Sequence, residues 1–166
     1  MAARGRFIPK NPGKYLGDPN RIFFRSSWEI RVMKEFDTNP SVYKWGSEEI
    51  KIPYIKPTDN RLHHYYPDFL VVYKDSNGEV IKEIVEVKPL KETVLTAKSS
   101  MYDKMQIIIN EAKWDAAAAF AASHGMRFRV LTEVSIFGGK MNKTKKTKPS
   151  KPTVGTKGTI KSKGSK

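Results

Sequence analysis

The chain contains the stretch Pro67-Asp-Phe-Leu-Val-Val-Tyr-Lys-Asp-Ser-Asn-Gly-Glu-Val-Ile-Lys-Glu-Ile-Val-Glu-Val-Lys88, which predicts two adjacent strands joined by a tight turn. Residues 65–73 and 80–87 are rich in β-branched and aromatic side chains, as is typical of strands. Asp75-Ser-Asn-Gly-Glu79 between them tolerates positive φ and favours a hairpin. Phe69-Leu-Val-Val72 is apolar without a break, so we expect the first strand at the centre of a sheet, buried on both faces.

Helices are predicted on both sides of this hairpin in the sequence. The first covers residues 25–37, because its serines suit an N-cap and Asn39-Pro40 ends the helical pattern. The second covers residues 101–124 and ends at Gly125. Its apolar side chains at helical spacing predict one buried face, formed by Met101, Met105, Ile108, Ala112, Ala116, Ala119 and Phe120.

Further strands complete the pattern. They are predicted at residues 42–45, 49–54 and 127–132, with a polar loop at 56–61. A helix, three or four strands, a second helix and a last strand predict the α/β class, with a mixed central β-sheet flanked by helices. We expect residues 25–137 to form this single domain.

The two ends of the chain differ from this domain in composition. Residues 1–24 are dense in turn formers and predict an extended N-terminal arm without a helix or strand of its own. Residues 138–166 lack large apolar side chains almost entirely and predict a disordered, Lys-rich tail. From Lys140 onward there are ten Lys and no acid, which leaves 21 basic against 17 acidic residues, or +4, for the rest of the chain.

The tail charge has two interpretations. It would hold nucleic acid through its phosphates without reading sequence, with a strong dependence on salt. Alternatively, it only keeps the protein soluble. Four lysines of this tail are the predicted contacts: Lys143, Lys145, Lys146 and Lys148.

The composition excludes several classes of protein. The absence of cysteine excludes disulfides and cysteine-ligated zinc, so any metal must bind oxygen or histidine. The sequence has no apolar run of about 18 residues and no apolar segment near its start, which predicts neither a membrane span nor a secretory signal. An intracellular or virion setting is therefore expected.

Four charged residues are candidates for a shared site because of where they lie in the predicted elements: Glu29, Asp68, Glu86 and Lys88. Glu86 and Lys88, two apart on a strand, point to one face about 6.5 Å from each other. Asp68 enters the apolar strand, where a carboxylate is costly without a cation. Glu29 falls inside the apolar arc of the first helix, whereas the other charges of that helix lie on its opposite side.

Each residue alone has a simpler explanation. Glu29 lies three residues after Ser26, which is the spacing of a capping box. Asp68 would suit a strand entrance, and Glu86 with Lys88 a solvated strand face. Their joint order favours a catalytic site, because three acids and a lysine would meet at one place on the sheet.

These residue types suit hydrolysis of a phosphodiester. Mg²⁺, for which Mn²⁺ is expected to substitute, neutralises the charge that builds on phosphate oxygens and activates water when carboxylates hold it. The predicted ligands are Asp68, Glu86 and the Val87 carbonyl, with Glu29 as a ligand of a second metal or of bound water. Lys88 would orient the attacking water and stabilise the phosphoryl charge.

Other polar residues close to these four in the sequence are candidates for DNA contacts. Arg21, Arg25 and Ser27 precede or begin the first helix, whose N-terminus favours phosphate. His63 and His64 precede the strand of Asp68 and would contact phosphate or position water. Ordinary surface charge and packing are the alternatives for all five.

Pro67-Asp68 with Glu86-Val87-Lys88 resembles the motif of the PD-(D/E)XK nuclease superfamily, and Glu29 matches the acid that its members often carry on the first helix. This resemblance implies a restriction-endonuclease-like core. Over residues 5–132 the chain also resembles the head completion nucleases of T-even-type tailed phages. The matching segments are Gly5-Arg-Phe-Ile-Pro-Lys-Asn-Pro, Lys14-Tyr-Leu-Gly-Asp-Pro, Phe24-Arg-Ser-Ser-Trp-Glu29, Trp45-Gly-Ser-Glu-Glu49, Ile52-Pro-Tyr54 and His63-His-Tyr-Tyr-Pro-Asp-Phe69.

The second resemblance implies a Mg²⁺-dependent DNA endonuclease that acts in phage head completion after DNA packaging. It also implies portal or neck proteins as partners, and a place in the virion or in the host cytoplasm during assembly. The alternative is a nonenzymatic DNA-binding structural protein of the phage head or portal that keeps the nuclease fold. The sequence leaves the oligomeric state and the form of the DNA substrate open.

Overall fold

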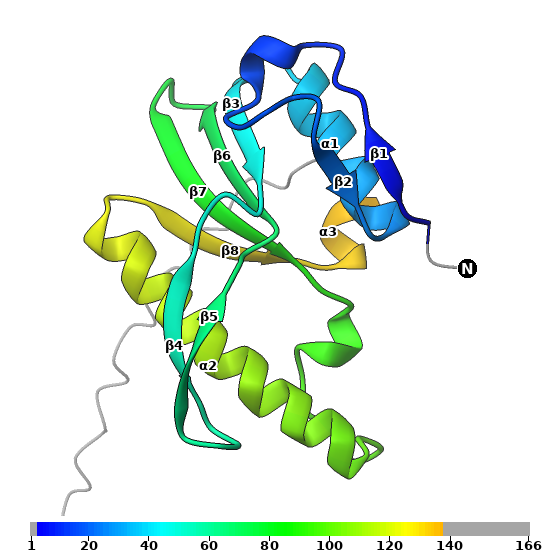
Figure 1. Cartoon of the computed structure of the whole chain (residues 1–166), viewed down its shortest axis with the longest axis vertical. Helices are drawn as coiled ribbons and strands as arrows, with labels where there is room; N and C mark the ends of the chain where they lie inside the picture. The colour runs from blue at the N-terminus through cyan, green and yellow to red at the C-terminus, as the bar shows by residue number, and fades with distance from the viewer. Residues whose placement is uncertain (1–2, 138–166) are drawn as a thin grey trace, which may run out of the picture.

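A computed structural model describes residues 3–137 of the chain (Figure 1). The helices are α1 (Ser27–Thr38), α2 (Met101–Ser123) and α3 (Glu133–Phe137), with single-turn helices η1 (Pro12–Lys14) and η2 (Leu90–Glu92). The strands are β1 (Gly5–Phe7), β2 (Ile22–Phe24), β3 (Val42–Ser47), β4 (Ile52–Lys56), β5 (Arg61–Tyr65), β6 (Phe69–Lys74), β7 (Val80–Val87) and β8 (Arg127–Leu131).

The central sheet has the strand order β3-β6-β7-β8 and is mixed. β6 pairs antiparallel with β3 and β7, whereas β7 pairs parallel with β8. A parallel pair needs a long crossover, and α2 provides it. The predicted α/β class with a mixed central sheet flanked by helices is therefore confirmed, as is the hairpin of β6 and β7.

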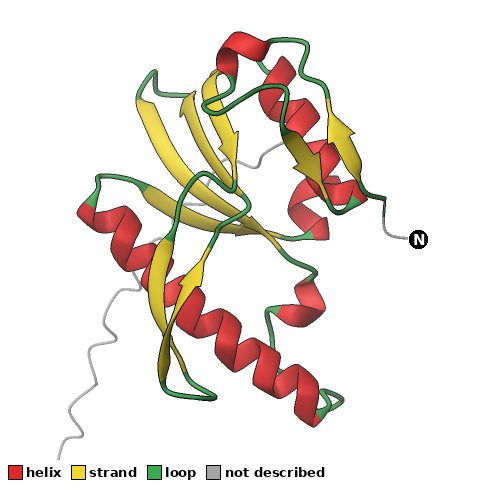
Figure 2. Ribbon diagram, in the orientation of Figure 1, coloured by secondary structure: helices red, strands yellow, loops and turns green. Residues whose placement is uncertain are grey.

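Helices cover both faces of this sheet (Figures 1 and 2). On one face α1 packs with β1 and β2, and the core there includes Trp45, Phe69 and Val85. On the other face α2 packs with β4 and β5 around Ile84. Val85 and Ile84 are neighbours on β7, so the alternation of its side chains divides the two cores.

The strands before β6 differ from the prediction. β4 and β5 form a separate two-stranded sheet, in which part of the predicted loop at 56–61 is strand or tight turn. Asn60 turns the chain there with a φ of 53°. The predicted strand at 65–73 is interrupted, because Pro67 has no N–H to donate to a ladder, so β5 ends at Tyr65 and β6 begins at Phe69.

The N-terminal arm also differs from the prediction of a segment without strands. β1 and β2 pair antiparallel, with Gly5 opposite Phe24 and Phe7 opposite Ile22. The turn formers that the sequence displays lie between these two strands, which accounts for the error. Ile22 is 1% exposed, and Tyr15 packs edge-on against Trp45 with ring centroids 4.9 Å apart, so the arm contributes to the core.

The predicted buried face of α2 is wrong for its first half and for Ala119. Met101, Met105, Ile108 and Ala119 are exposed, whereas Ala112, Ala116 and Phe120 are partly buried. The buried side chains are Ile107, Ile109, Asn110, Ala117 and Ala121. The first turns of α2 run past the edge of the sheet (Figure 1), so apolar spacing there has no core to meet.

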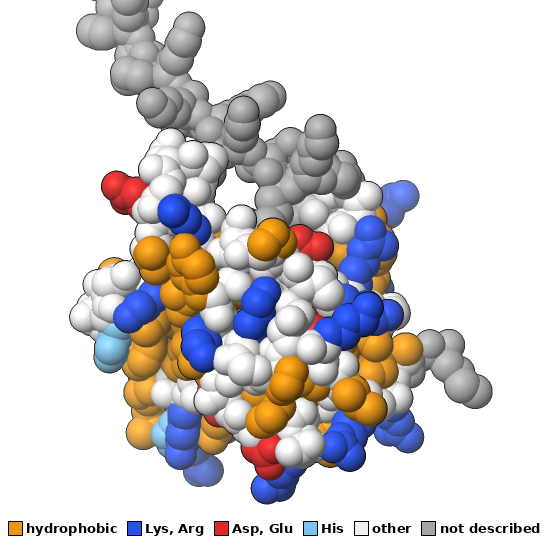
Figure 3. Space-filling model, turned by 90° about the horizontal axis from the view of Figure 1, so that it is seen from above, with side chains coloured by type: hydrophobic (Ala, Val, Ile, Leu, Met, Phe, Trp, Pro, Cys, Tyr) orange, Lys and Arg blue, Asp and Glu red, His pale blue; other side chains and the backbone are white. Residues whose placement is uncertain are grey.

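Two observations concern the surface. Lys and Arg side chains are spread among apolar ones on the face seen from above in Figure 3, with few acidic side chains between them. No helix within residues 3–137 is long and apolar enough to cross a membrane. The tail residues Lys143, Lys145, Lys146 and Lys148, predicted to contact DNA, lie outside the described residues.

Asp37 at the end of α1 fixes the N-terminal arm. Its carboxylate is 1% exposed and accepts the backbone N–H of Lys10 at 2.7 Å and that of Asn11 at 3.1 Å. The Asn11 amide donates in return to the Asp37 carbonyl at 2.8 Å. A buried acceptor therefore satisfies two backbone donors of a segment 26 or 27 residues away in sequence.

We expect Asp37→Ala to lower the free energy of unfolding by about 2–4 kcal/mol, because two backbone donors lose a charged acceptor. Urea unfolding followed by circular dichroism measures the loss. Glu79→Ala removes the same charge from an exposed turn and should change stability by less than about 0.5 kcal/mol. Equal effects of the two substitutions would contradict this role of Asp37.

Candidate active site

Asp68 and Glu86 lie side by side where the β6–β7 ladder ends. The last backbone pair of the ladder is Phe69 with Val85. Beyond it, the Val87 N–H donates to the Asp68 carboxylate at 2.8 Å, and the Asp68 N–H donates to the Glu86 carboxylate at 3.4 Å. Each acid thus accepts a backbone donor of the opposite chain segment, which fixes the two carboxylates next to each other.

The surroundings of this pair penalise its negative charge. Burial, with Glu86 and Glu29 nearby, raises the pKa of Asp68 from 3.8 to about 8, against the opposing effect of the Val87 N–H and of Lys88. Burial also raises the pKa of Glu86, which is 6% exposed. Two acids confined in this way would be stabilised in their ionised form by a cation between them.

Two neighbouring side chains partly offset this penalty. The Tyr65 hydroxyl donates to Glu86 at 2.7 Å, and the Lys88 ammonium lies 3.6 Å from the other oxygen of the same carboxylate. Burial and Glu86 raise the pKa of Tyr65, so its hydroxyl keeps the proton that it donates. Glu86 and Lys88 are two apart at the end of β7, and their relative position agrees with the predicted shared face.

Glu29 is occupied by local contacts. Its carboxylate accepts the Arg25 N–H at 2.8 Å and the Ser26 hydroxyl at 3.2 Å, while its own N–H donates to Ser26 at 3.1 Å. These are the contacts of a helix cap, which the sequence offered as the simpler explanation. Glu29 nevertheless lies near enough to raise the pKa of Asp68.

The donor set suits a hard divalent cation, although it is small. Two carboxylates with restricted freedom are typical ligands of Mg²⁺, which keeps several waters. Within residues 3–137 no three Asp, Glu, His or Cys side chains are grouped closely enough to bind one ion. Asp68 and Glu86 would therefore have to rely on the Val87 carbonyl, water or substrate oxygens for the remaining positions.

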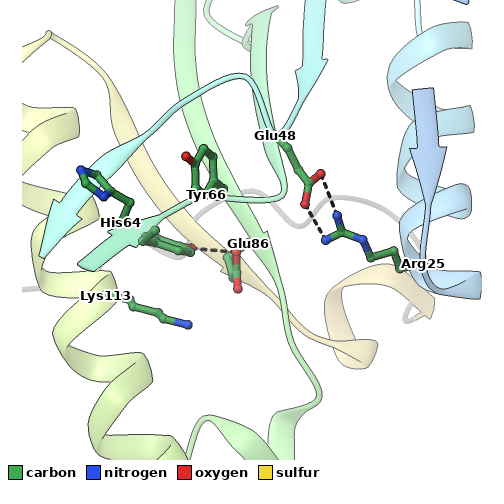
Figure 4. Close-up of a pocket in the computed structure, with 7 residues that line it drawn as sticks. Arg25, Glu48, His64, Tyr66, Glu86 and Lys113 are labelled. Atoms are coloured by element: carbon green, nitrogen blue, oxygen red, sulfur yellow. Dashed lines mark hydrogen bonds and ion pairs between the residues drawn. The ribbon is translucent and has the colours of Figure 1, made fainter. Parts of the chain in front are cut away.

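A cavity of about 580 Å³ opens beside Glu86 (Figure 4). Its lining residues are Arg25, Glu48, His64, Tyr65, Tyr66, Glu86 and Lys113. Lys113 extends from α2 toward Glu86, and burial together with Lys88 lowers the pKa of its ammonium group. Its ammonium lies 5.7 Å from the ring centre of Tyr65 and 6.0 Å from that of Tyr54.

An ion pair closes the opposite side of this cavity. The two terminal nitrogens of the Arg25 guanidinium, Nη1 and Nη2, donate to the Glu48 carboxylate at 2.6 and 3.1 Å. Glu48 has a φ of 55°, which is uncommon for a residue with a side chain, and its N–H donates to the Asp68 carbonyl at 3.1 Å. The strained turn therefore connects the ion pair directly to the backbone of Asp68.

The other predicted DNA contacts are scattered. His64 lines the cavity, whereas His63 bonds Asp59 at 2.8 Å on the β4–β5 hairpin. Arg21 and Ser27 are exposed, and neither lines this cavity. The structure thus brings Arg25 and His64 to the site and leaves the other three outside its lining.

Sequence reasoning missed Tyr65, Lys113 and Glu48. Lys113 had a signal, since it is the only Lys or Arg between Lys104 and Arg127 in an otherwise alanine-rich helix. Tyr65 also had one, because it precedes Pro67-Asp68 by two residues. Glu48 had none, because its role depends on a positive φ and on a contact with distant Arg25.

The raised pKa of Asp68 predicts how stability depends on pH. Between pH 3.8 and about 8 the folded protein holds a proton that the unfolded chain has lost, so the free energy of unfolding falls as pH rises through this window. In EDTA we expect Asp68→Asn to remove much of this fall and to be more stable than the wild type near pH 8, by of order 1 kcal/mol.

Urea unfolding at a series of pH values measures this dependence, and exposed Glu79→Gln is the control, with the wild-type slope. An unchanged slope in Asp68→Asn would show that Asp68 does not carry the raised pKa.

Two comparisons with known proteins show what this chain is similar to. Residues 39–133 match the family of the TnsA-like endonuclease N terminal domain, a range that includes Asp68, Glu86 and Lys88 but not Glu29. The chain is 38% identical over 143 residues to the head completion nuclease of Enterobacteria phage T4, which covers 80% of this chain and 93% of the relative. The chain therefore belongs to the phage head completion nuclease family and carries its restriction-endonuclease-like, TnsA-like endonuclease domain.

Proposed function

We propose that this nuclease is a divalent-metal-dependent DNA endonuclease whose active site is formed by Asp68, Glu86 and Lys88. One observation carries the proposal: the half-buried Asp68 and the buried Glu86 are held next to each other where their charges repel, with Lys88 3.6 Å from Glu86. Such an arrangement is costly for folding alone. It suits a site that takes up a cation and a phosphate.

Each residue of the candidate site would have its own role in catalysis. Asp68, Glu86 and the Val87 carbonyl would hold Mg²⁺ or Mn²⁺, which when bound supplies charge neutralisation at the phosphate and activation of water. Lys88 would orient the attacking water and stabilise charge on the phosphoryl oxygens. Tyr65, through its 2.7 Å hydrogen bond, would keep Glu86 ionised and oriented.

Other predicted residues have weaker support. Glu29 lies near Asp68, but its carboxylate caps α1, so a role at a second metal or a bound water would require it to exchange these contacts. Arg25 would bind phosphate only by leaving Glu48, whereas His64 is exposed at the cavity. DNA contacts by Arg21, Ser27, His63 and the tail lysines stay predictions.

The biological setting follows from the relative. The T4 protein is named a head completion nuclease, and 93% of its length aligns with this chain. We therefore propose that this protein acts on DNA at the portal or neck of the phage head, in contact with portal or neck proteins, in the virion or in the host cytoplasm.

Cleavage of supercoiled plasmid tests the enzyme directly. We expect nicking with Mg²⁺ and none in EDTA, and a decrease of at least about 10²-fold for Asp68→Ala, Glu86→Gln and Lys88→Met. Lys82→Met is the matched control for Lys88→Met, because Lys82 is exposed on β7, the strand that ends one residue before Lys88. Full activity in EDTA or in Asp68→Ala would overturn the proposal, and DNA binding without cleavage would favour the nonenzymatic alternative.

Metal binding has a readout that is independent of cleavage. We expect Mg²⁺ at several times its Kd to raise the free energy of unfolding near pH 8 by about 1 kcal/mol in the wild type, because only the folded chain presents both carboxylates. The increase should vanish in Asp68→Ala and persist in Lys82→Met. An equal increase in Asp68→Ala would place the metal elsewhere.

A further inference from the structure

A second hollow lies beside the candidate active site. It is bounded by the segment after β7 and by the first half of α2, and its volume is about 540 Å³. Lys88, the lysine next to Glu86, lines this second hollow. Lys113 lines both cavities, so the two hollows meet at this lysine.

The lining of the second hollow is positively charged. Four lysines face it, Lys88, Lys91, Lys98 and Lys113, against the two acids Glu92 and Asp103, which gives a formal balance of four minus two, or +2. Asp103 is already engaged, because its carboxylate accepts the Ser100 N–H at 3.0 Å and the Ser100 hydroxyl at 2.7 Å. The net charge of the lining is positive and suits an anion.

The rest of the lining suits a nucleobase. Asn110 is 5% exposed and borders the hollow, where it brings a side-chain amide to the lining. Gln106 adds a second amide, and Tyr102, 71% exposed, offers an aromatic ring at the margin. Amides pair with base edges and aromatic rings stack on bases, so this combination is typical of sites for unpaired nucleic acid.

The size of the hollow limits its occupant. A volume of about 540 Å³ is that of a pocket for one small molecule. A double helix, whose major groove alone is about 12 Å wide, does not enter such a space. One or two unpaired nucleotides fit the volume, with their phosphates on the lysines.

We propose that this second hollow binds unpaired nucleotides of the substrate strand next to the phosphate that is cut, with Lys113 contacting the phosphate between the two cavities. The inference rests on the proposed function, because it places the unpaired nucleotides next to the phosphate that Asp68 and Glu86 would cut. It implies that the preferred DNA is single-stranded beside the cut, as at an overhang, a frayed end or a branch.

Binding without cleavage tests this site. Fluorescence anisotropy in EDTA compares a fully paired duplex with the same duplex carrying a short single-stranded flap, at constant salt. We expect the wild type to bind the flapped DNA about tenfold more tightly, because an unpaired base can stack on an aromatic ring of the hollow and a paired base cannot. In Tyr102→Ala/Lys98→Ala this preference should fall close to one.

Matched substitutions separate the hollow from general charge and aromatic content. Tyr43→Ala and Lys82→Ala change exposed residues on β3 and β7 and should keep the flap preference of the wild type. Because Tyr102 and Lys98 are themselves exposed, the double variant should melt at the wild-type temperature. Equal binding of both DNAs by the wild type, or a preference retained by the double variant, would overturn the inference.

The outcome is distinct from that of the plasmid test. Mg²⁺-dependent plasmid cleavage by a wild type without flap preference would defeat only the strand-binding site. A flap preference that Tyr102→Ala/Lys98→Ala abolishes, in a protein that never cuts DNA, would support the binding site and defeat the nuclease mechanism.

Discussion

The reciprocal hydrogen bonding of Asp68 and Glu86 is the constraint on which the site depends. An antiparallel ladder normally pairs backbone with backbone, but here it continues by one step through side chains, with Val87 donating to Asp68 and Asp68 donating to Glu86. Side chains replace the backbone here because Pro67 has no N–H to donate and the residues that precede it belong to the separate β4–β5 sheet. These hydrogen bonds fix two mutually repelling carboxylates next to each other at the end of an apolar sheet.

The elements around the sheet each contribute one group to this position. The β4–β5 hairpin supplies Tyr65, α2 supplies Lys113, and the turn after β3 supplies Glu48, whose N–H bonds the Asp68 carbonyl. None of these groups neighbours another along the chain. The two hydrophobic cores on opposite faces of the sheet fix their relative positions, so the packing of apolar side chains determines the electrostatics of the cavity.

How well each feature could be predicted depends on how far apart along the chain the residues that form it lie. The β6–β7 hairpin and the shared face of Glu86 and Lys88 depend on neighbouring residues, and alternation was enough to predict them. The pairing of Gly5 with Phe24 and the burial of Asn110 depend on tertiary contacts, which local pattern does not contain. Glu29 illustrates the limit of local pattern. Its spacing from Ser26 predicts a helix cap, and its place in the apolar arc predicts a catalytic role. The structure shows the cap.

The parallel pairing of β7 with β8 has a consequence for the timing of activity. Everything from Lys88 to Met126 lies between the two paired strands, so the sheet cannot close until the chain has been synthesised past β8. A topology with such distant partners has a high contact order and folds slowly. An unfinished chain that ends before β8 would carry Asp68 and Glu86 but would lack the fourth strand of the central sheet, so the surroundings of the two acids are completed only when β8 has been added.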